Sequence, residues 1–156
     1  IPLSFGILLN LVSVCNTNDP ELLWAFISRY AKGATPENAP YLDKLVGYAI
    51  NYYNDFVKPA KKYRAATDAE KAALTELRDM LKTLDAGTNG GDIQTQVFEV
   101  GKNHNYENLR DWFKALYEIL LGQEQGPRMG SFIVLYGIDE SVALIDRVLA
   151  DEDLGV

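Results

Sequence analysis

Apolar residues recur at a helical period within residues 93–137, and this pattern constrains the fold more than any other feature of the sequence. Spacings of three and four residues predict an amphipathic helix with one buried face. Asn105 is its expected N-cap, and Gly122 is expected to end it in a left-handed conformation. Pro127 should open the next helix, which runs through residues 131–136. The apolar residues of the first helix are Leu109, Trp112, Phe113, Leu116, Ile119 and Leu120.

Further helices are predicted along the rest of the chain. Asp19 before Pro20 is a typical helix start, and Thr67 with Glu70 has the spacing of a capping box. Asp92 is the expected cap of a helix near residue 93. A strand is the alternative for the apolar run at residues 4–15, which is short and contains valines. The predicted helices cover residues 4–15, 20–30, 40–57, 68–84, 93–100 and 139–149.

These patterns predict an all-α fold, a compact single domain of about eight helices. We expect the domain to cover residues 1–150 and an acidic, frayed tail to cover residues 151–156. The chain opens at Ile1, without a methionine and close to an apolar run, so we expect it to be a piece of a longer protein. That first run is too short to span a membrane and lacks the basic start of a signal peptide.

Charge and cysteine content restrict the function. The 156 residues carry a formal net charge of −7, which argues against indiscriminate nucleic-acid binding. The acidic excess is concentrated in residues 139–156, so the rest of the chain is closer to neutral. The single cysteine, Cys15, forbids an intrachain disulfide and favours a reducing compartment, which we take to be the cytoplasm.

The sequence shows no strong sign of catalysis. It has no phosphate-binding glycine loop and no dinucleotide fingerprint, and one histidine with one cysteine cannot build a usual zinc site. Cys15 is expected to be a buried small apolar residue, and His104 to lie at the surface in a polar turn. Gln123 and Glu124 are the most unusual polar pair, but we expect no catalytic residue, cofactor or metal in this chain.

Two basic features are candidates for binding phosphate. Lys58, Lys61, Lys62 and Arg64 lie within seven residues, beside Tyr63 and near Tyr52 and Tyr53. The cations could contact phosphates while the rings stack on bases. The alternative is a solvated helix end, where lysines are favoured by the helix dipole. Arg128 either pairs with Glu124 or presents its guanidinium to a phosphate or a base edge.

Long strings of the sequence resemble the C-terminal part of class I lysyl-tRNA synthetases. The clearest is NLRDWFKALYEILLGQEQGPRMGSFIVLYG, preceded by IQTQVFEVGK. The segments just upstream in that family are resembled by two earlier strings, FGILLNLVSVCNTNDPELLWAFISRY and YLDKLVGYAINYYNDFVKPAKKYRA. The resemblance therefore covers nearly all of the chain in order.

The resemblance implies a helical-cage type anticodon-binding domain at the anticodon end of the enzyme. The catalytic domain of that family joins lysine to tRNA using ATP, with Mg, and its HIGH-like and KMSKS-like signatures are absent from this sequence. The implied partners are the anticodon stem-loop of tRNA(Lys) and the parent enzyme's own catalytic domain, with no DNA and no membrane. The residues expected to bind RNA are Lys58, Lys61, Lys62, Tyr63, Arg64 and Arg128.

A helical protein-interaction or scaffold domain without RNA contact is the rival hypothesis. A continuous positive face would favour RNA binding, whereas scattered cations paired with Asp and Glu would favour the rival. An independent enzyme would need a deep pocket with converging ionisable groups.

Overall fold

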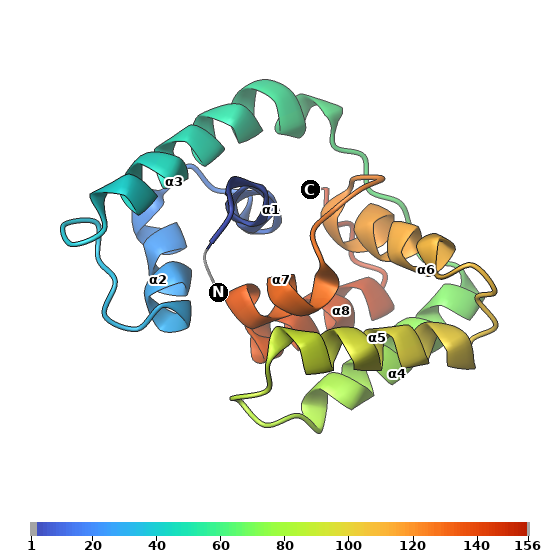
Figure 1. The fold of residues 1–156 in the computed structure, drawn as a ribbon. Helices are drawn as coiled ribbons and strands as arrows, with labels where there is room; N and C mark the ends of the chain where they lie inside the picture. Colours follow the sequence, from blue (N-terminus) through green and yellow to red (C-terminus); the bar gives the residue numbers. More distant parts are fainter. Residues whose placement is uncertain (1–2, 156) are drawn as a thin grey trace. The chain divides into compact units, whose positions relative to one another are not determined.

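The computed structural model describes residues 3–155, and all regular secondary structure in this part of the chain is helical (Figure 1). It contains eight α-helices, two π-helical turns and one 3-10 turn, which confirms the predicted all-α fold class. Two compact units are distinguished, Ile1–Lys61 and Lys62–Val156. The boundary predicted at residue 150 remains a prediction, and Ile1, Pro2 and Val156 lie outside the described residues.

The first unit is built from α1 (Phe5–Cys15), α2 (Pro20–Tyr30) and α3 (Pro40–Tyr52). Helix α1 packs against both α2 and α3. Asp19 caps α2 as predicted, accepting a hydrogen bond from the N–H of Glu21 at 3.0 Å. The core of this unit consists of Leu8, Leu11, Val12, Leu23, Ile27, Val46, Ala49 and Tyr53.

The end of the long helix in the first unit is irregular. After α3 the chain forms a π-helical turn, η1 (Tyr53–Val57), and then a 3-10 turn, η2 (Lys58–Ala60). Pro59 lies within η2, and a proline cannot donate to the helical ladder, although Lys58 before it keeps helical dihedral angles of φ −53° and ψ −45°. The predicted end of this helix near residue 57 is therefore confirmed, and the last turns are looser than predicted.

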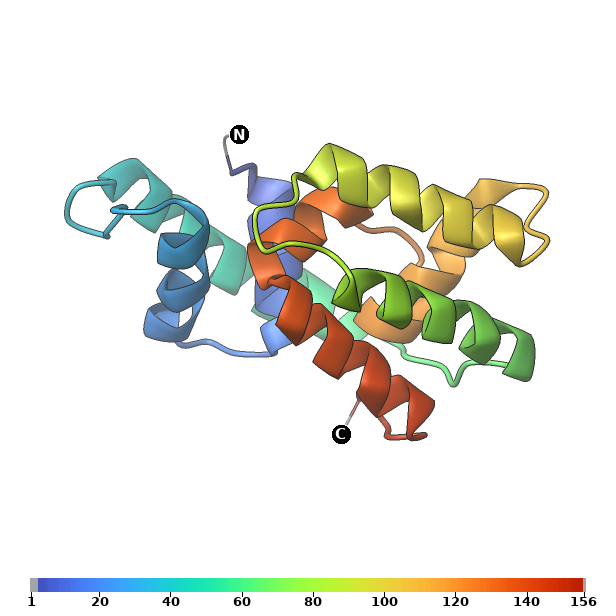
Figure 2. The ribbon, with the colours of Figure 1, turned by 90° about the horizontal axis from the view of Figure 1, so that it is seen from below.

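The second unit contains five α-helices. They are α4 (Asp68–Lys82), α5 (Gly90–Asn103), α6 (Leu109–Leu116), α7 (Met129–Tyr136) and α8 (Ile138–Leu149), and a π-helical turn, η3 (Tyr117–Leu121), extends α6. Helix α5 lies along α7, and α4 lies along α8, as Figure 2 shows. The Thr67–Glu70 capping box is present as predicted.

The predicted amphipathic face in this unit is confirmed. Trp112, Leu116 and Ile119 are at most 2% exposed, and the indole N–H of Trp112 donates to the carbonyl of Val97 at 3.0 Å. The helix stops at Gly122, which adopts the expected left-handed conformation with φ 69°. Burial of this face therefore anchors α6 and η3 to the rest of the unit.

Two glycines bring α5 and α7 unusually close together. A Cβ added at Gly130 would collide with the carbonyl oxygen of Gly90 and would lie 2.8 Å from the backbone nitrogen of Gln94. The N–H of Gly130 donates to the buried side-chain oxygen of Gln94 at 2.7 Å. The glycine in the PRMG string is thus needed because backbone passes backbone at this point.

Four expected boundaries and one expected burial were wrong. The cap of α5 is Asn89 rather than Asp92, and the cap of α6 is Asn108, since Asn105 lies in a turn with φ 66°. Helix α7 begins at Met129, two residues after Pro127, and α8 begins one residue before Asp139. Asn, Asp and Pro are all favoured near a helix start, so closely spaced ones leave the exact start open. Cys15 is half-buried because it lies in the last turn of α1.

Candidate nucleic-acid interface

Part of the basic segment is an extended strap, residues 62–67, that enters the second unit ahead of α4. The backbone N–H of Lys62 donates to the carbonyl of Gly122 at 2.8 Å. The ring of Tyr63 lies over Gly122, so closely that a Cβ there would be 3.1 Å from the ring carbons. The strap is therefore fastened to the start of the 122–130 loop, which carries Arg128.

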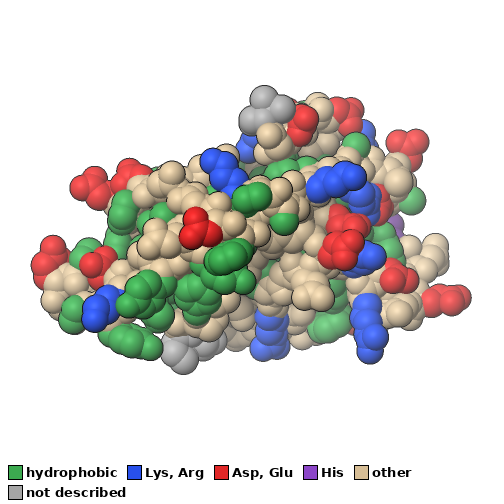
Figure 3. Space-filling model, turned by 90° about the horizontal axis from the view of Figure 1, so that it is seen from above, with side chains coloured by type: hydrophobic (Ala, Val, Ile, Leu, Met, Phe, Trp, Pro, Cys, Tyr) green, Lys and Arg blue, Asp and Glu red, His purple; other side chains and the backbone are tan. Residues whose placement is uncertain are grey.

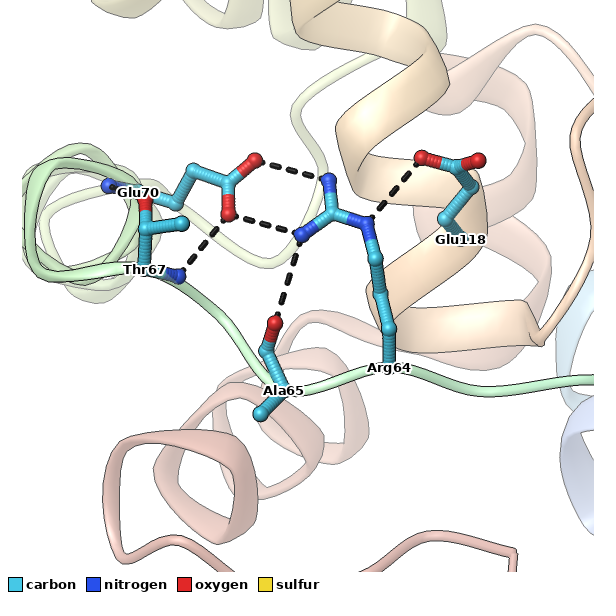
Figure 4. Close-up of polar contacts among 5 residues, drawn as sticks. All are labelled: Arg64, Ala65, Thr67, Glu70 and Glu118. Carbon is cyan, nitrogen blue, oxygen red and sulfur yellow. Dashed lines mark hydrogen bonds and ion pairs between the residues drawn. The ribbon is translucent and has the colours of Figure 1, made fainter.

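Arg64 holds the strap in place by binding two carboxylates, as Figure 4 shows. Its Nη1 and Nη2 donate to the two oxygens of Glu70 at 2.8 and 2.7 Å. Its Nε donates to Glu118 in η3 at 3.1 Å. The charge of Arg64 is thus compensated inside the second unit.

Glu70 has a double role in this arrangement. Its Oε1 also accepts the N–H of Thr67 at 2.9 Å, which closes the capping box of α4. The hydrogen bonds from Arg64 hold the pKa of Glu70 at about 2, although its burial acts in the opposite direction. The same partners raise the pKa of Arg64 above its usual value. The pair therefore stays ionised at any physiological pH.

Lys61 and Lys58 belong to the first unit and differ sharply. The ammonium of Lys61 donates to the carbonyl of Ser13 at 2.8 Å and to the hydroxyl of Tyr53 at 3.3 Å. It also lies 5.2 Å from the centre of the Tyr53 ring. Burial, with a smaller contribution from the charge of Lys58, lowers the pKa of Lys61 to about 8. Lys61 thus caps the carboxyl end of α1, where a cation is favoured.

Besides Arg64, which is paired, the exposed members of the predicted set are Lys58, Lys62 and Arg128. Within residues 3–155, none of their side chains forms a hydrogen bond or an ion pair. The predicted alternative for Arg128, a pair with Glu124, is therefore not observed. Tyr117 anchors the loop that carries Arg128, because its hydroxyl donates a hydrogen bond to the carbonyl of Pro127 at 2.8 Å.

Four of the other cations form ion pairs in the described part of the chain. Lys71 binds Asp151, and Arg78 binds both Asp79 and Asp146. Lys102 and Arg147 pair with Glu99 and Glu152, respectively. On the face drawn in Figure 3, several basic side chains lie beside acidic ones.

A pocket of about 270 Å³ lies in the second unit, between the strap, Ile119, Val148 and residues 151–154. Its cation, Arg64, is already paired, and Asp151, Glu152 and Asp153 line the other side. This set of groups favours neither phosphate binding nor a paired acid and base. His104 lies outside it and contacts Glu76, with 3.2 Å between Nε2 and Oε1.

In residues 3–155, no three His, Cys, Asp or Glu side chains lie close enough together to hold a metal ion. None of the helices in this part combines the length and the hydrophobicity needed to cross a bilayer.

Comparison with known proteins gives consistent relatives. The chain is 52% identical over 147 residues to the lysine–tRNA ligase of Rickettsia bellii (strain OSU 85-389), which covers 94% of this chain and 28% of that protein. It is 51% identical over 148 residues to the lysine–tRNA ligase of Roseobacter denitrificans, with 95% and 28% covered, respectively. The lysine–tRNA ligase of Rickettsia felis is 49% identical over 147 residues.

The match covers nearly all of this chain but only part of each relative, because the chain spans about 28% of the relatives' length. No protein-family model matches the chain, and no solved structure matches it significantly. The match to the ligases nevertheless runs along 94% of the chain at about half identity, and the structure is helical throughout its described part, as the resemblance implied. The chain is therefore similar, along nearly all of its length, to one part of the lysine–tRNA ligases.

Proposed function

We propose that this chain is the anticodon-binding, C-terminal helical part of a class I lysine–tRNA ligase, and that it binds tRNA(Lys) without being catalytic itself. The observation that carries the proposal is the identity of about 50% to lysine–tRNA ligases over 94% of the chain. The parent enzyme would join lysine to tRNA(Lys) with ATP, in the cytoplasm. ATP and its Mg would bind in the catalytic part, which contains the signatures that this sequence lacks.

The contacts that we assign to RNA in the second unit are Lys62, Tyr63 and Arg128. Lys62 and Arg128 are exposed, and their charges have no partner among residues 3–155, which suits them to phosphate oxygens. Tyr63 is half-buried against Gly122 and is the aromatic residue that we assign to an unstacked base. Arg64 then acts indirectly, because its bonds to Glu70 and Glu118 hold the strap that carries these groups.

In the first unit, Lys58 is the exposed residue of the predicted RNA-binding set. Lys61 instead binds Ser13 and Tyr53 and so stabilises the unit itself. Within residues 3–155, three cations of the predicted set are exposed without an ion-pair partner, so we expect few phosphate contacts and weak binding by the isolated chain. The affinity of the whole enzyme would come from two linked contact regions, each modest alone.

The test is a salt titration of binding between the 156-residue chain and a lysine tRNA transcript. The slope of log K against log salt should fall by about 0.7–0.9 for each phosphate contact removed. Lys62→Gln with Arg128→Gln, and separately Lys58→Gln, should lower both the affinity and the slope. Lys82→Gln is the matched control, because Lys82 is also exposed but lies in the last turn of α4 and was not predicted to bind RNA. Unchanged slopes in the Lys62 and Arg128 variant would reject these contacts.

A second candidate is a protein-interaction domain without RNA contact. It is favoured by the pairing of Arg64, Lys71, Arg78, Lys102 and Arg147 with carboxylates in the second unit. Absence of tRNA binding at low salt, by a chain that circular dichroism shows to be folded, would favour this function over RNA binding.

A further inference from the structure

One face of α3 and η1 carries large aromatic side chains that are exposed to solvent. Tyr41, Tyr48, Tyr52 and Phe56 are 75%, 58%, 43% and 65% exposed, respectively. Their spacings of seven, four and four residues place them on one helical face, which we call the aromatic stripe. Apolar side chains gather on the face of the molecule that carries α3, as Figure 3 shows.

The aromatic stripe is extended and internally braced. From Tyr41 to Phe56 it is about 22 Å long at the rise of a helix. The rings of Tyr52 and Phe56 are 5.0 Å apart, and Phe5 of α1 packs edge-on against Tyr52 at 5.8 Å. In the described part of the chain, only Leu22 is a large exposed apolar residue outside this stripe. Such a concentration on one face is typical of an interaction surface.

The charges around the stripe do not suit RNA. Residues 40–60 contain two acidic residues, Asp43 and Asp55, and two basic residues, Lys44 and Lys58. Binding to a phosphate backbone needs an excess of cations, because release of counterions supplies most of its affinity. Protein interfaces are instead rich in Tyr and Phe and poor in charged residues at their centre. The composition of the stripe therefore fits a protein partner.

We infer that the aromatic stripe is the surface on which the remainder of the lysine–tRNA ligase chain packs. This inference rests on the proposed function. The relatives are more than three times as long as the segment matched here, since that segment covers only 28% of them. A partner in the same chain is present at a high effective concentration, so a face of this modest size is sufficient for stable contact. Its occupant is thus a protein surface that is mainly apolar.

The test compares the isolated chain with a full-length ligase by hydroxyl-radical footprinting. The full-length protein is the Rickettsia bellii enzyme in which the 147 matched residues are replaced by those of this chain. The four stripe residues should be modified about fivefold more slowly in the full-length protein, because an interface core excludes water. Leu22, which is 43% exposed, is the matched control and should react equally in both. Leu23, 1% exposed, should stay unreactive and reports correct folding.

Equal rates at the stripe in both proteins would overturn the inference. Protection that appears only after lysine tRNA is added would overturn it in favour of RNA, and protection of the isolated chain that rises with its concentration would overturn it in favour of a second copy. If Leu23 becomes reactive in the chimera, the chimera is misfolded, and the unaltered Rickettsia bellii enzyme is footprinted instead. Full reactivity of its residues at the positions aligned with the stripe would also overturn the inference. Binding of tRNA by the isolated chain is measured separately, so failure of the proposed function is recognised independently.

Discussion

Arg64 donates two hydrogen bonds to the carboxylate of Glu70, at 2.8 and 2.7 Å, and this bidentate pair joins the strap to the first turn of α4. A third bond, from Nε of Arg64 to Glu118, connects the same side chain to η3. Three segments that are separate in the sequence therefore meet at one guanidinium. The planar fork of arginine suits this task, and a lysine could not replace it.

Replacing Arg64 by alanine should destabilise the chain by about 2 kcal/mol, because Glu70 would lose its partner while remaining buried. The free energy of unfolding in urea measures this loss. Arg78→Ala is the matched control, since Arg78 also binds two carboxylates but both are at the surface, and its loss should be clearly smaller. Equal losses in the two variants would contradict a structural role specific to Arg64.

The decrease in the free energy of unfolding at acid pH should depend on Glu70. Its pKa is about 2 in the folded chain against 4.5 for an ordinary glutamate, so the unfolded state binds more protons between these values. The contribution is complete above pH 4.5 and is lost as the pH falls towards 2. The full shift corresponds to roughly 3 kcal/mol, but Arg64 is partly exposed, so we expect about 2.

Comparison with Glu70→Gln isolates this effect. The difference in unfolding free energy between the parent chain and the variant should shrink as the pH is lowered from 4.5 towards 2. A difference that stays constant across this range would mean that the Arg64–Glu70 pair is not what sets the acid sensitivity.

Substitution of Lys61 should lower the stability of the chain and substitution of Lys58 should not, although the two residues are only three positions apart. Lys61→Met loses the bonds to Ser13 and Tyr53 and should cost about 1–2 kcal/mol of stability. Lys58→Met removes only an exposed charge and should be nearly neutral. Chemical denaturation of both variants measures the contrast, and similar stabilities would reject the capping role of Lys61.

Replacement of two glycines by alanine should change the stability of the chain in opposite directions. Gly130→Ala should cost about 3 kcal/mol, because the added methyl group meets the backbone of α5, which cannot give way as a side chain would. Gly47→Ala should instead stabilise the chain by about 0.5–1 kcal/mol, since Gly47 lies inside α3 with open space around it. Thermal unfolding followed by circular dichroism reports both changes. A harmless Gly130→Ala substitution would contradict the close approach of α5 and α7.

Local features of this fold could be read from the sequence. The Thr67–Glu70 capping box, the Asp19–Pro20 helix start and the left-handed Gly122 were predicted correctly, because each depends on neighbours within a few residues. Asn89 was missed as a cap because Asp92 is an equally good candidate. The two in fact act together, with Asn89 accepting from the N–H of Asp92 and donating to its carboxylate.

The candidate site could be predicted only as a region. Four cations in residues 58–64 look equivalent in the sequence, yet Lys61 and Arg64 bind groups of the chain itself while Lys58 and Lys62 remain exposed. Their partners are remote, since Ser13 lies 48 residues from Lys61 and Glu118 lies 54 residues from Arg64. Pairings over such separations depend on the packing of helices, which no local pattern encodes. The role of these residues in RNA binding stays a prediction.

The measurement that tests the central claim most directly is binding of the 156-residue chain to a lysine tRNA transcript and to the same transcript with an altered anticodon, at low salt. If the chain recognises the anticodon, the altered transcript should bind about tenfold more weakly, since a lost base contact costs about 1–3 kcal/mol. Equal binding of the two transcripts, or no binding of either by the folded chain, would contradict the account.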